Sequence, residues 1–288
     1  MIRVFTATLA IAFASTAFAQ SPGTAIPVPG SAQPMGVQPG GLPVARPAVD
    51  PKLAAHLAAW ETRMKEIGNI VCAAEKVQTD NVLKRQLAKQ VATIYCMKPN
   101  LAFMRLDRAP DQPPDPNDFL TYICDGKAIY QYSGRQKEMA EFKLNAAGGI
   151  QGNLLLEFIS GSMSAKDALN RFDISILKED ANYLYLTIKP TLVSDREDFE
   201  TMTLVFYSPT IKPELQHLRY LPAMVKMTKN QNKEDEVWTF KLPQINGKNV
   251  QAAMFQKQPL PDKWRLAPMN GTANPTSVTP KVARPQVP

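Results

Sequence analysis

Few side chains in this sequence could carry out catalysis. The 288 residues include only two histidines, His56 and His217, which lie far apart in the sequence. The densest group of carboxylates, which could act as general acids or bases, is Asp195, Glu197, Asp198 and Glu200. A solvated acidic loop explains this run of charges better than a catalytic centre does. No G-x-S-x-G, H-E-x-x-H or P-loop motif occurs, so we expect a protein that is not an enzyme and uses no cofactor.

The three cysteines, Cys72, Cys96 and Cys124, could form a disulfide or bind a metal. No C-x-x-C or C-x-x-H spacing occurs, so we expect no metal site. All three lie in strand-like sequence, where small buried cysteines are common. An oxidising compartment permits disulfides, and an odd number leaves at least one thiol over. Cys72 and Cys96 could lie on paired strands, which makes them the candidate disulfide.

The first residues of the chain have the pattern of a secretory signal peptide, residues 1–19. Arg3 provides a positive charge, an apolar stretch over residues 4–14 follows, and Ala17-Phe18-Ala19 provides small residues for cleavage after Ala19. The apolar stretch is too short to span a bilayer, which disfavours the alternative of an uncleaved membrane anchor. The sequence therefore predicts a periplasmic or secreted protein that is soluble after cleavage.

Composition divides the remaining chain into three parts. Residues 20–49 are rich in Pro, Gly and Ala and nearly free of charge, which predicts a flexible linker. Residues 267–288 have a similar Pro-rich character and predict a disordered tail. Between them, residues 50–266 are numerous enough for one domain with a sizeable core.

The chain is basic, with a formal net charge of +7. Its nearest approach to a cationic cluster is Lys84, Arg85, Lys89 and Lys98. A basic patch could meet an anionic membrane surface or a nucleic acid, but the acidic residues interspersed along the chain favour solvated strand faces. Export also disfavours nucleic acid, so we expect no nucleic-acid partner.

The domain begins with a helix and continues as strands. Asp50 and Pro51 form a helix start, and apolar residues follow at three- and four-residue spacing, on one helix face: Leu53, Leu57, Trp60, Met64 and Ile67. Alternation predicts strands over 70–79 and 91–97, although 82–90 also reads as a helix. Further strands are expected over 102–107, 120–124 and 127–132, with a tight turn at Asp125-Gly126.

The middle of the domain changes to a helical pattern. Residues 150–159 are apolar on almost every side, as in a short buried helix, and Ser164 begins a second helix with Asp167 in the capping position. Later strands are predicted over 172–178, 183–189, 202–207, 224–229, 237–242 and 250–255. The sequence thus predicts an α+β fold: a single curved antiparallel β-sheet, an incomplete barrel, with an N-terminal helix and central helices covering its concave face.

The order of short motifs along the domain resembles that of the periplasmic lipoprotein-carrier family, the LolA/LolB-like proteins. The chain looks like a divergent member of this family. The motifs are Lys98-Pro99-Asn100-Leu101, Asp125-Gly126-Lys127 before Tyr130 and Tyr132, Gly152-Asn153-Leu154-Leu155-Leu156, Ile188-Lys189-Pro190, and Phe255 before Pro259-Leu260-Pro261. Together they span nearly the whole domain. Two features depart from the family: Lys98 stands where the carriers commonly have Arg, and residues 109–118 and 193–200 are insertions.

This resemblance implies a half-barrel whose apolar concave surface takes acyl chains of lipids or lipoproteins, in a protein expected to be a monomer. The implied cavity and lid residues are Phe103, Tyr122, Tyr130, Tyr132, Leu154, Leu155, Phe158 and Ile159. Lys98 becomes the latch candidate, although Lys lacks the planar fork of Arg. Envelope membrane proteins are further possible partners.

Two functions remain open. The first is a non-enzymatic carrier or binding protein for acyl chains, and the twelve methionines suit a pliable apolar lining. The same residues could equally fill a closed core. The alternative is an envelope sensor or scaffold protein that uses this fold to bind a protein partner, with the Pro-rich leader as a tether.

Overall fold

The structure is a computed structural model that describes residues 49–144, 154–196, 198–229 and 231–267, apart from the side chains of residues 154–156 and 194. The expected signal peptide lies outside these residues, as do nearly all of the linker and tail. Helix α1 (Pro51–Glu66) begins as predicted, because the Asp50 side chain accepts a hydrogen bond from the backbone N–H of Lys52 at 2.8 Å. Its buried residues are Leu53, Leu57, Trp60 and Met64, the predicted apolar face.

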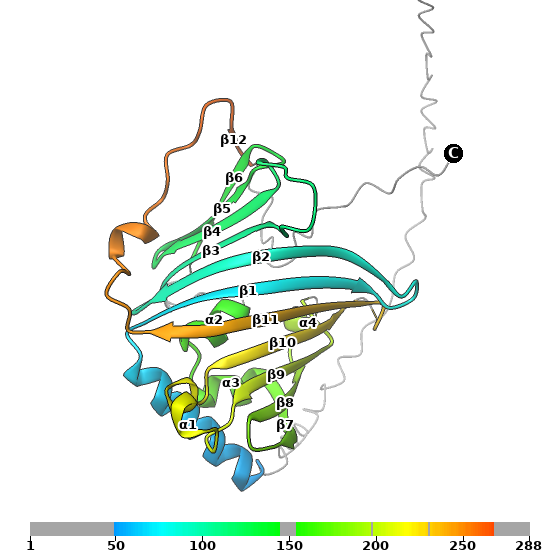
Figure 1. The fold of residues 1–288 in the computed structure, drawn as a ribbon, viewed down its shortest axis with the longest axis vertical. Helices are drawn as coiled ribbons and strands as arrows, with labels where there is room; N and C mark the ends of the chain where they lie inside the picture. The colour runs from blue at the N-terminus through cyan, green and yellow to red at the C-terminus, as the bar shows by residue number, and fades with distance from the viewer. Residues whose placement is uncertain (1–48, 145–153, 197, 230, 268–288) are drawn as a thin grey trace, which may run out of the picture. The chain divides into compact units, whose positions relative to one another are not determined.

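Twelve strands form one sheet in the order β12-β6-β5-β4-β3-β2-β1-β11-β10-β9-β8-β7 (Figure 1). Adjacent strands are antiparallel except for β12 and β6. The bounds are β1 (Asn69–Asp80), β2 (Arg85–Met97), β3 (Leu101–Arg108), β4 (Phe119–Asp125), β5 (Ala128–Ser133), β6 (Glu138–Lys143), β7 (Phe172–Glu179), β8 (Tyr183–Pro190), β9 (Thr201–Tyr207), β10 (Pro222–Lys229), β11 (Glu234–Ile245) and β12 (Arg265–Leu266).

Two local expectations were wrong. Residues 82–90 do not form the helix that the sequence allowed as an alternative. They belong to a long hairpin, in which β2 begins at Arg85 and pairs with β1 along its length. Asp80 makes the turn by accepting hydrogen bonds from the backbone N–H groups of Val82 and Leu83, both at 2.9 Å. Residues 250–255 do not form a strand; they contain the short 3₁₀ helix η2 (Ala252–Phe255). Another 3₁₀ helix, η1 (Pro213–Leu218), lies between β9 and β10.

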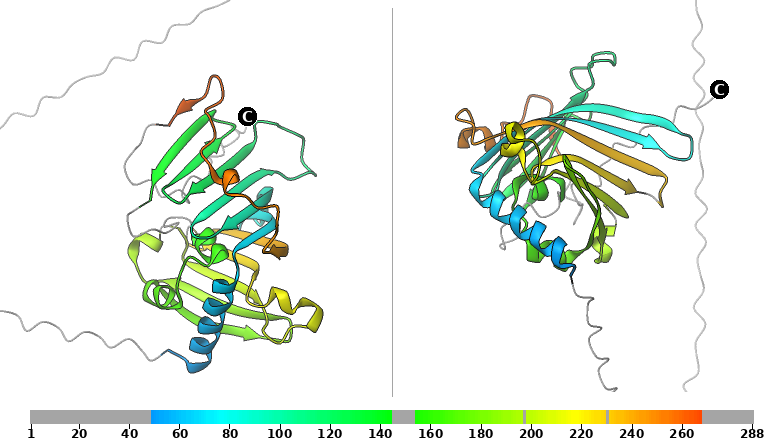
Figure 2. Two further views of the ribbon diagram at one scale, coloured as in Figure 1. Left: turned by 90° about the vertical axis from the view of Figure 1, so that its left-hand side faces the viewer. Right: turned by 60° about the horizontal axis from the view of Figure 1, so that its bottom comes forward.

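Three short helices follow β6: α2 (Leu154–Ser160), α3 (Ala165–Arg171) and α4 (Val193–Arg196). The predicted cap of α3 is confirmed, because Ser164 Oγ accepts a hydrogen bond from the backbone N–H of Asp167 at 3.0 Å and donates one to its carboxylate at 2.6 Å. The sheet curves around α2 and α3, and α1 runs along the open side (Figure 2). This arrangement confirms the predicted incomplete barrel with helices covering its concave face.

The two faces of the sheet bury separate apolar clusters. The larger one fills the concave side and joins α1, α2 and α3 to the alternate residues of the strands. The smaller one lies on the opposite side of β3 to β6 and consists of Ile123, Ala128, Tyr130, Tyr132 and Met139, with Phe103 and Trp264 packed against it. Side chains alternate between faces along a strand, so the parity of each residue decides its cluster.

Candidate lipid-binding site on the concave face

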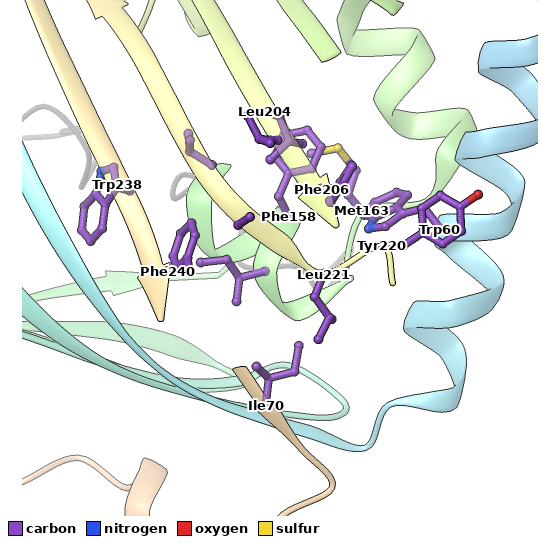
Figure 3. Close-up of a cluster of buried hydrophobic side chains, with 14 of the residues drawn as sticks. Trp60, Ile70, Phe158, Met163, Leu204, Phe206, Tyr220, Leu221, Trp238 and Phe240 are labelled. Atoms are coloured by element: carbon purple, nitrogen blue, oxygen red, sulfur yellow. The ribbon is translucent and has the colours of Figure 1, made fainter. Parts of the chain in front are cut away.

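Aromatic side chains from helices and strands meet inside the half-barrel (Figure 3). The ring of Trp60 on α1 lies 6.1 Å from that of Phe158 on α2 and 6.1 Å from that of Phe206 on β9, between centroids. Phe158 also packs at 6.3 Å against Phe172 at the start of β7. These distances are typical of aromatic pairs that add to stability beyond their buried area. Phe158 thus connects α2 to both α1 and the sheet.

Helix α2 is held by an ion-pair network as well as by packing. Arg171 at the end of α3 donates to Glu157 of α2 at 2.8 Å and to Asp195 of α4 at 3.1 Å. Burial alone would lower the pKa of Arg171, but the carboxylates of Asp195 and Glu157 raise it. The side chain of Glu157 is only 5% exposed, so its charge depends on such contacts. One guanidinium therefore links all three short helices.

The end of α2 also touches α1 and borders a pocket of about 250 Å³. Its lining comes from the end of α1, the start of β1, the end of β2 and the residues that follow α2, and it includes Ile67, Ile70, Met97, Pro99 and Gly161. The pocket therefore lies at the seam between α2 and the sheet.

The latch candidate Lys98 binds the end of α1. Its ammonium donates to the backbone carbonyls of Met64 at 2.6 Å and Lys65 at 2.8 Å, where a helix leaves carbonyls unpaired and favours positive charge. Burial lowers the pKa of Lys98. Both of these side-chain hydrogen bonds go to α1, so Lys98 clamps the end of α1.

The predicted lining residues are divided between the two faces. Tyr122, Phe158 and Ile159 are buried in the concave cluster, and burial followed by the charge of Glu236 raises the pKa of Tyr122. The side chains of Leu154 and Leu155 lie outside the described part of the structure. Their backbones lie in α2, within the predicted central helix.

Phe103, Tyr130 and Tyr132 lie on the opposite face from Tyr122, because they differ from it in strand parity. The C-terminal segment covers them: the Tyr132 hydroxyl donates to the Gln258 carbonyl at 2.7 Å, and Lys257 lies 5.0 Å from the ring of Tyr130. The expectation that these three side chains face the concave cavity is corrected by this placement.

The candidate disulfide is not formed in the structure. Cys72, Cys96 and Cys124 are free and buried. Cys72 faces Ile94 and Cys96 faces Ile70 across the same strand pair, so the two cysteines are diagonal neighbours, farther apart than a disulfide allows. Burial raises the pKa of Cys72 to about 12, which makes it a poor nucleophile. Among the described residues, no group of three metal-ligating side chains occurs.

Sequence reasoning missed a polar cluster on the same concave face. Glu236 of β11 accepts hydrogen bonds from the indole of Trp238 at 2.7 Å and from Gln78 at 3.3 Å, and pairs with Lys76 at 3.3 Å and Lys229 at 3.2 Å. Burial alone would raise the pKa of Glu236, but the charges of Lys76 and Lys229 and the hydrogen bond from Trp238 lower it to about 2. Lys76 and Gln78 continue the alternate positions of the buried Cys72 and Ala74. That parity was the available signal.

No family model matches the sequence, and no curated protein matches it at a significant level. Within the described residues, no helix is long and apolar enough to cross a membrane. The chain is similar to several solved structures at low sequence identity. A LolA superfamily protein from Nitrosomonas europaea shares 8% identity, with a TM-score of 0.37 over 70% of this chain and 97% of its own.

LprF from Mycobacterium bovis shares 13% identity, with a TM-score of 0.37 over 70% of this chain and 96% of its own. A chain in the MucA/MucB complex of Pseudomonas aeruginosa shares 10% identity, with a TM-score of 0.39 over 72% of this chain and 61% of its own. The structures to which the chain is similar thus include a protein of the LolA superfamily, at an identity and TM-score that assign no family, ligand or activity.

Proposed function

We propose that the protein is an exported, non-enzymatic carrier or binding protein that holds the acyl chains of lipids or lipoproteins on the concave face of the half-barrel. One observation carries this proposal: the apolar concave face of the sheet is covered by the short helix α2. This helix is held by the ring contacts of Phe158 and by the ion pair of Glu157 with Arg171. The signal-peptide pattern of residues 1–19 supports export.

The concave interior of the half-barrel is filled by side chains, so binding of an acyl chain requires α2 to move. Leu204, Ile94 and Ile188 are fully buried, and Phe158 is 4% exposed. An acyl chain of about 16 carbons gains roughly 12 kcal/mol on complete burial. That gain is comparable with the cost of displacing a single seven-residue helix.

Uptake of a fluorescent fatty acid tests this proposal. Phe158→Asp places a charge in the acyl-chain region and should abolish uptake, while the matched change Leu177→Asp, at a strand position that is 62% exposed, should leave it unchanged. Circular dichroism checks that each variant is folded. Equal uptake by folded Phe158→Asp and wild-type protein would refute this binding region.

A second variant tests the role of α2 without placing a charge in the core. The triple change Glu157→Gln, Arg171→Met and Asp195→Asn removes the ion pairs at 2.8 Å and 3.1 Å and leaves none of these three charges behind. Uptake should become faster, because α2 loses its link to α3 and α4. Unchanged uptake rates in this folded variant would show that α2 does not control access.

The dense packing also favours the second candidate, an envelope sensor or scaffold protein that binds a protein partner. The pocket of about 250 Å³ beside α2 falls below the usual range of small-ligand sites, about 300 to 1,000 Å³. Lipid extraction from natively purified protein separates the two candidates. Co-purifying lipid supports the carrier, whereas a lipid-free protein with a stable protein partner supports the scaffold.

A further inference from the structure

In the polar cluster on the concave wall, the ammonium groups of Lys76 and Lys229 share one buried carboxylate, that of Glu236. The side chains of Lys76, Lys229 and Glu236 are 16%, 23% and 9% exposed. Among the described residues, Glu236 is the only carboxylate within ion-pair distance of either lysine. Buried charges are normally paired, so the cluster carries one positive charge more than its own residues balance.

Glu236 is already saturated by donors and holds the lysines in place. Trp238 and Gln78 donate to it along with the two ammonium groups, and Lys76 also lies 5.2 Å from the ring of Trp238. The lysines are therefore fixed before any ligand arrives, which lowers the entropic cost of binding an anion. Both lysine side chains keep some exposure, 16% and 23%, so neither is sealed from solvent.

The cluster adjoins the apolar interior. Trp238 and Phe240 occupy successive concave positions on β11, and both belong to the apolar cluster that includes Phe158 of α2. Figure 3 shows Trp238 and Phe240 on one side of the interior and Phe158, Phe206 and Trp60 beyond them. An amphiphile could therefore place its chain among the aromatic side chains and its head group at the lysines.

We propose that Lys76 and Lys229 form a seat for the anionic head group, a phosphate or carboxylate, of an amphiphilic ligand whose acyl chain lies in the concave interior. This inference rests on the proposed acyl-chain-binding function and specifies its ligand class. Glu236 is a positioning residue in this site, since it orients the two lysines and does not contact the anion.

Displacement of a neutral fluorophore, N-phenyl-1-naphthylamine, tests the head-group site. Dodecyl phosphate, laurate and dodecanol share the same chain length and differ in charge. We expect at least one of the two anions to displace the fluorophore at about tenfold lower concentration than dodecanol does. Comparison of phosphate with carboxylate identifies the preferred head group, and inorganic phosphate alone should displace nothing, because it has no acyl chain.

The double change Lys76→Met with Lys229→Met should reduce this anionic advantage to about twofold while dodecanol displaces the fluorophore as before. Lys226→Met is the matched control, since Lys226 lies on the other face of β10 and pairs with Asp235 at 2.9 Å. If the double variant fails to fold, Lys229→Met alone serves as the test and should reduce the anionic advantage. Lys229→Arg, which keeps the positive charge, should retain that advantage.

Different results would overturn the head-group site and the acyl-chain-binding function. Equal displacement by dodecanol and the anions in the wild-type protein, or an anionic advantage that survives in folded lysine variants, overturns the head-group site alone. Displacement by inorganic phosphate without a chain would also overturn it, in favour of a free-anion site. Failure of all three amphiphiles to bind overturns the proposed function together with this inference.

Discussion

Gly161 packs so closely against Met64 that a side chain at residue 161 would have no room. A Cβ atom added there would lie 2.6 Å from the Cβ of Met64, and the backbone has a φ of +66°. This contact joins the end of α2 to α1 directly, beside the pocket at the seam of the half-barrel. Both the close approach and the left-handed conformation require glycine.

Gly161→Ala should therefore destabilise the protein by about 2 kcal/mol, through the steric clash and the strained φ. The second change Met64→Ala should restore little net stability, because removal of the Met64 side chain beyond Cβ leaves the Cβ contact and creates a cavity. Urea unfolding measures both effects. Gly247→Ala is the control, because its added Cβ would meet its nearest atom at 3.8 Å; a similar loss there would contradict the reason given.

Lys98→Met should loosen the end of α1. The change removes two charge-assisted hydrogen bonds, to the carbonyls of Met64 and Lys65, at a cost of about 1 to 2 kcal/mol. Lys98→Arg should retain most of the stability, because a guanidinium can reach two carbonyls at once. Hydrogen exchange of the α1 amides gives the readout, and unchanged protection in Lys98→Met would rule out the clamp.

Acid should weaken the protein partly through Glu236. Its pKa is lowered from 4.5 to about 2 in the folded state, so its stabilising contribution is complete above pH 4.5 and is lost as the pH falls from 4.5 towards 2. The shift corresponds to about 3 kcal/mol. Glu236→Gln should be less stable at pH 6 and should lose less stability between pH 5 and pH 3. Parallel pH profiles for the two proteins in urea unfolding would refute this role.

The cysteines should behave as three protected thiols. Burial raises the pKa of Cys72 to about 12 and also raises those of Cys96 and Cys124, so the thiolate that reacts is scarce. Folded protein should react slowly with a thiol reagent at pH 8, and all three thiols should react after unfolding. Recovery of a Cys72–Cys96 peptide by mass spectrometry of exported protein would contradict the free thiols.

Local sequence determined the elements of this fold. Asp50 and Pro51 specify the start of α1, Asp125 and Gly126 specify a turn in which Gly126 has a φ of 86°, and Ser164 with Asp167 specifies the cap of α3. Each of these depends on residues within one or two turns of chain, where side-chain type alone restricts the backbone. The apolar residues between 150 and 159 likewise predicted a short buried helix, and α2 lies in this stretch.

The tertiary structure decided which residues face the concave interior. Tyr122 and Tyr130 both lie in apolar strand sequence, yet they face opposite sides of the sheet because strand alternation has a period of two. Only the packed C-terminal segment shows that Tyr130 is buried on the far side. The distant partners of Glu236 and Lys98 follow from strand order and helix placement, which join residues far apart in the chain. Spacing could place Lys76 and Gln78 on the concave face of β1, but it could not identify Glu236 as their partner.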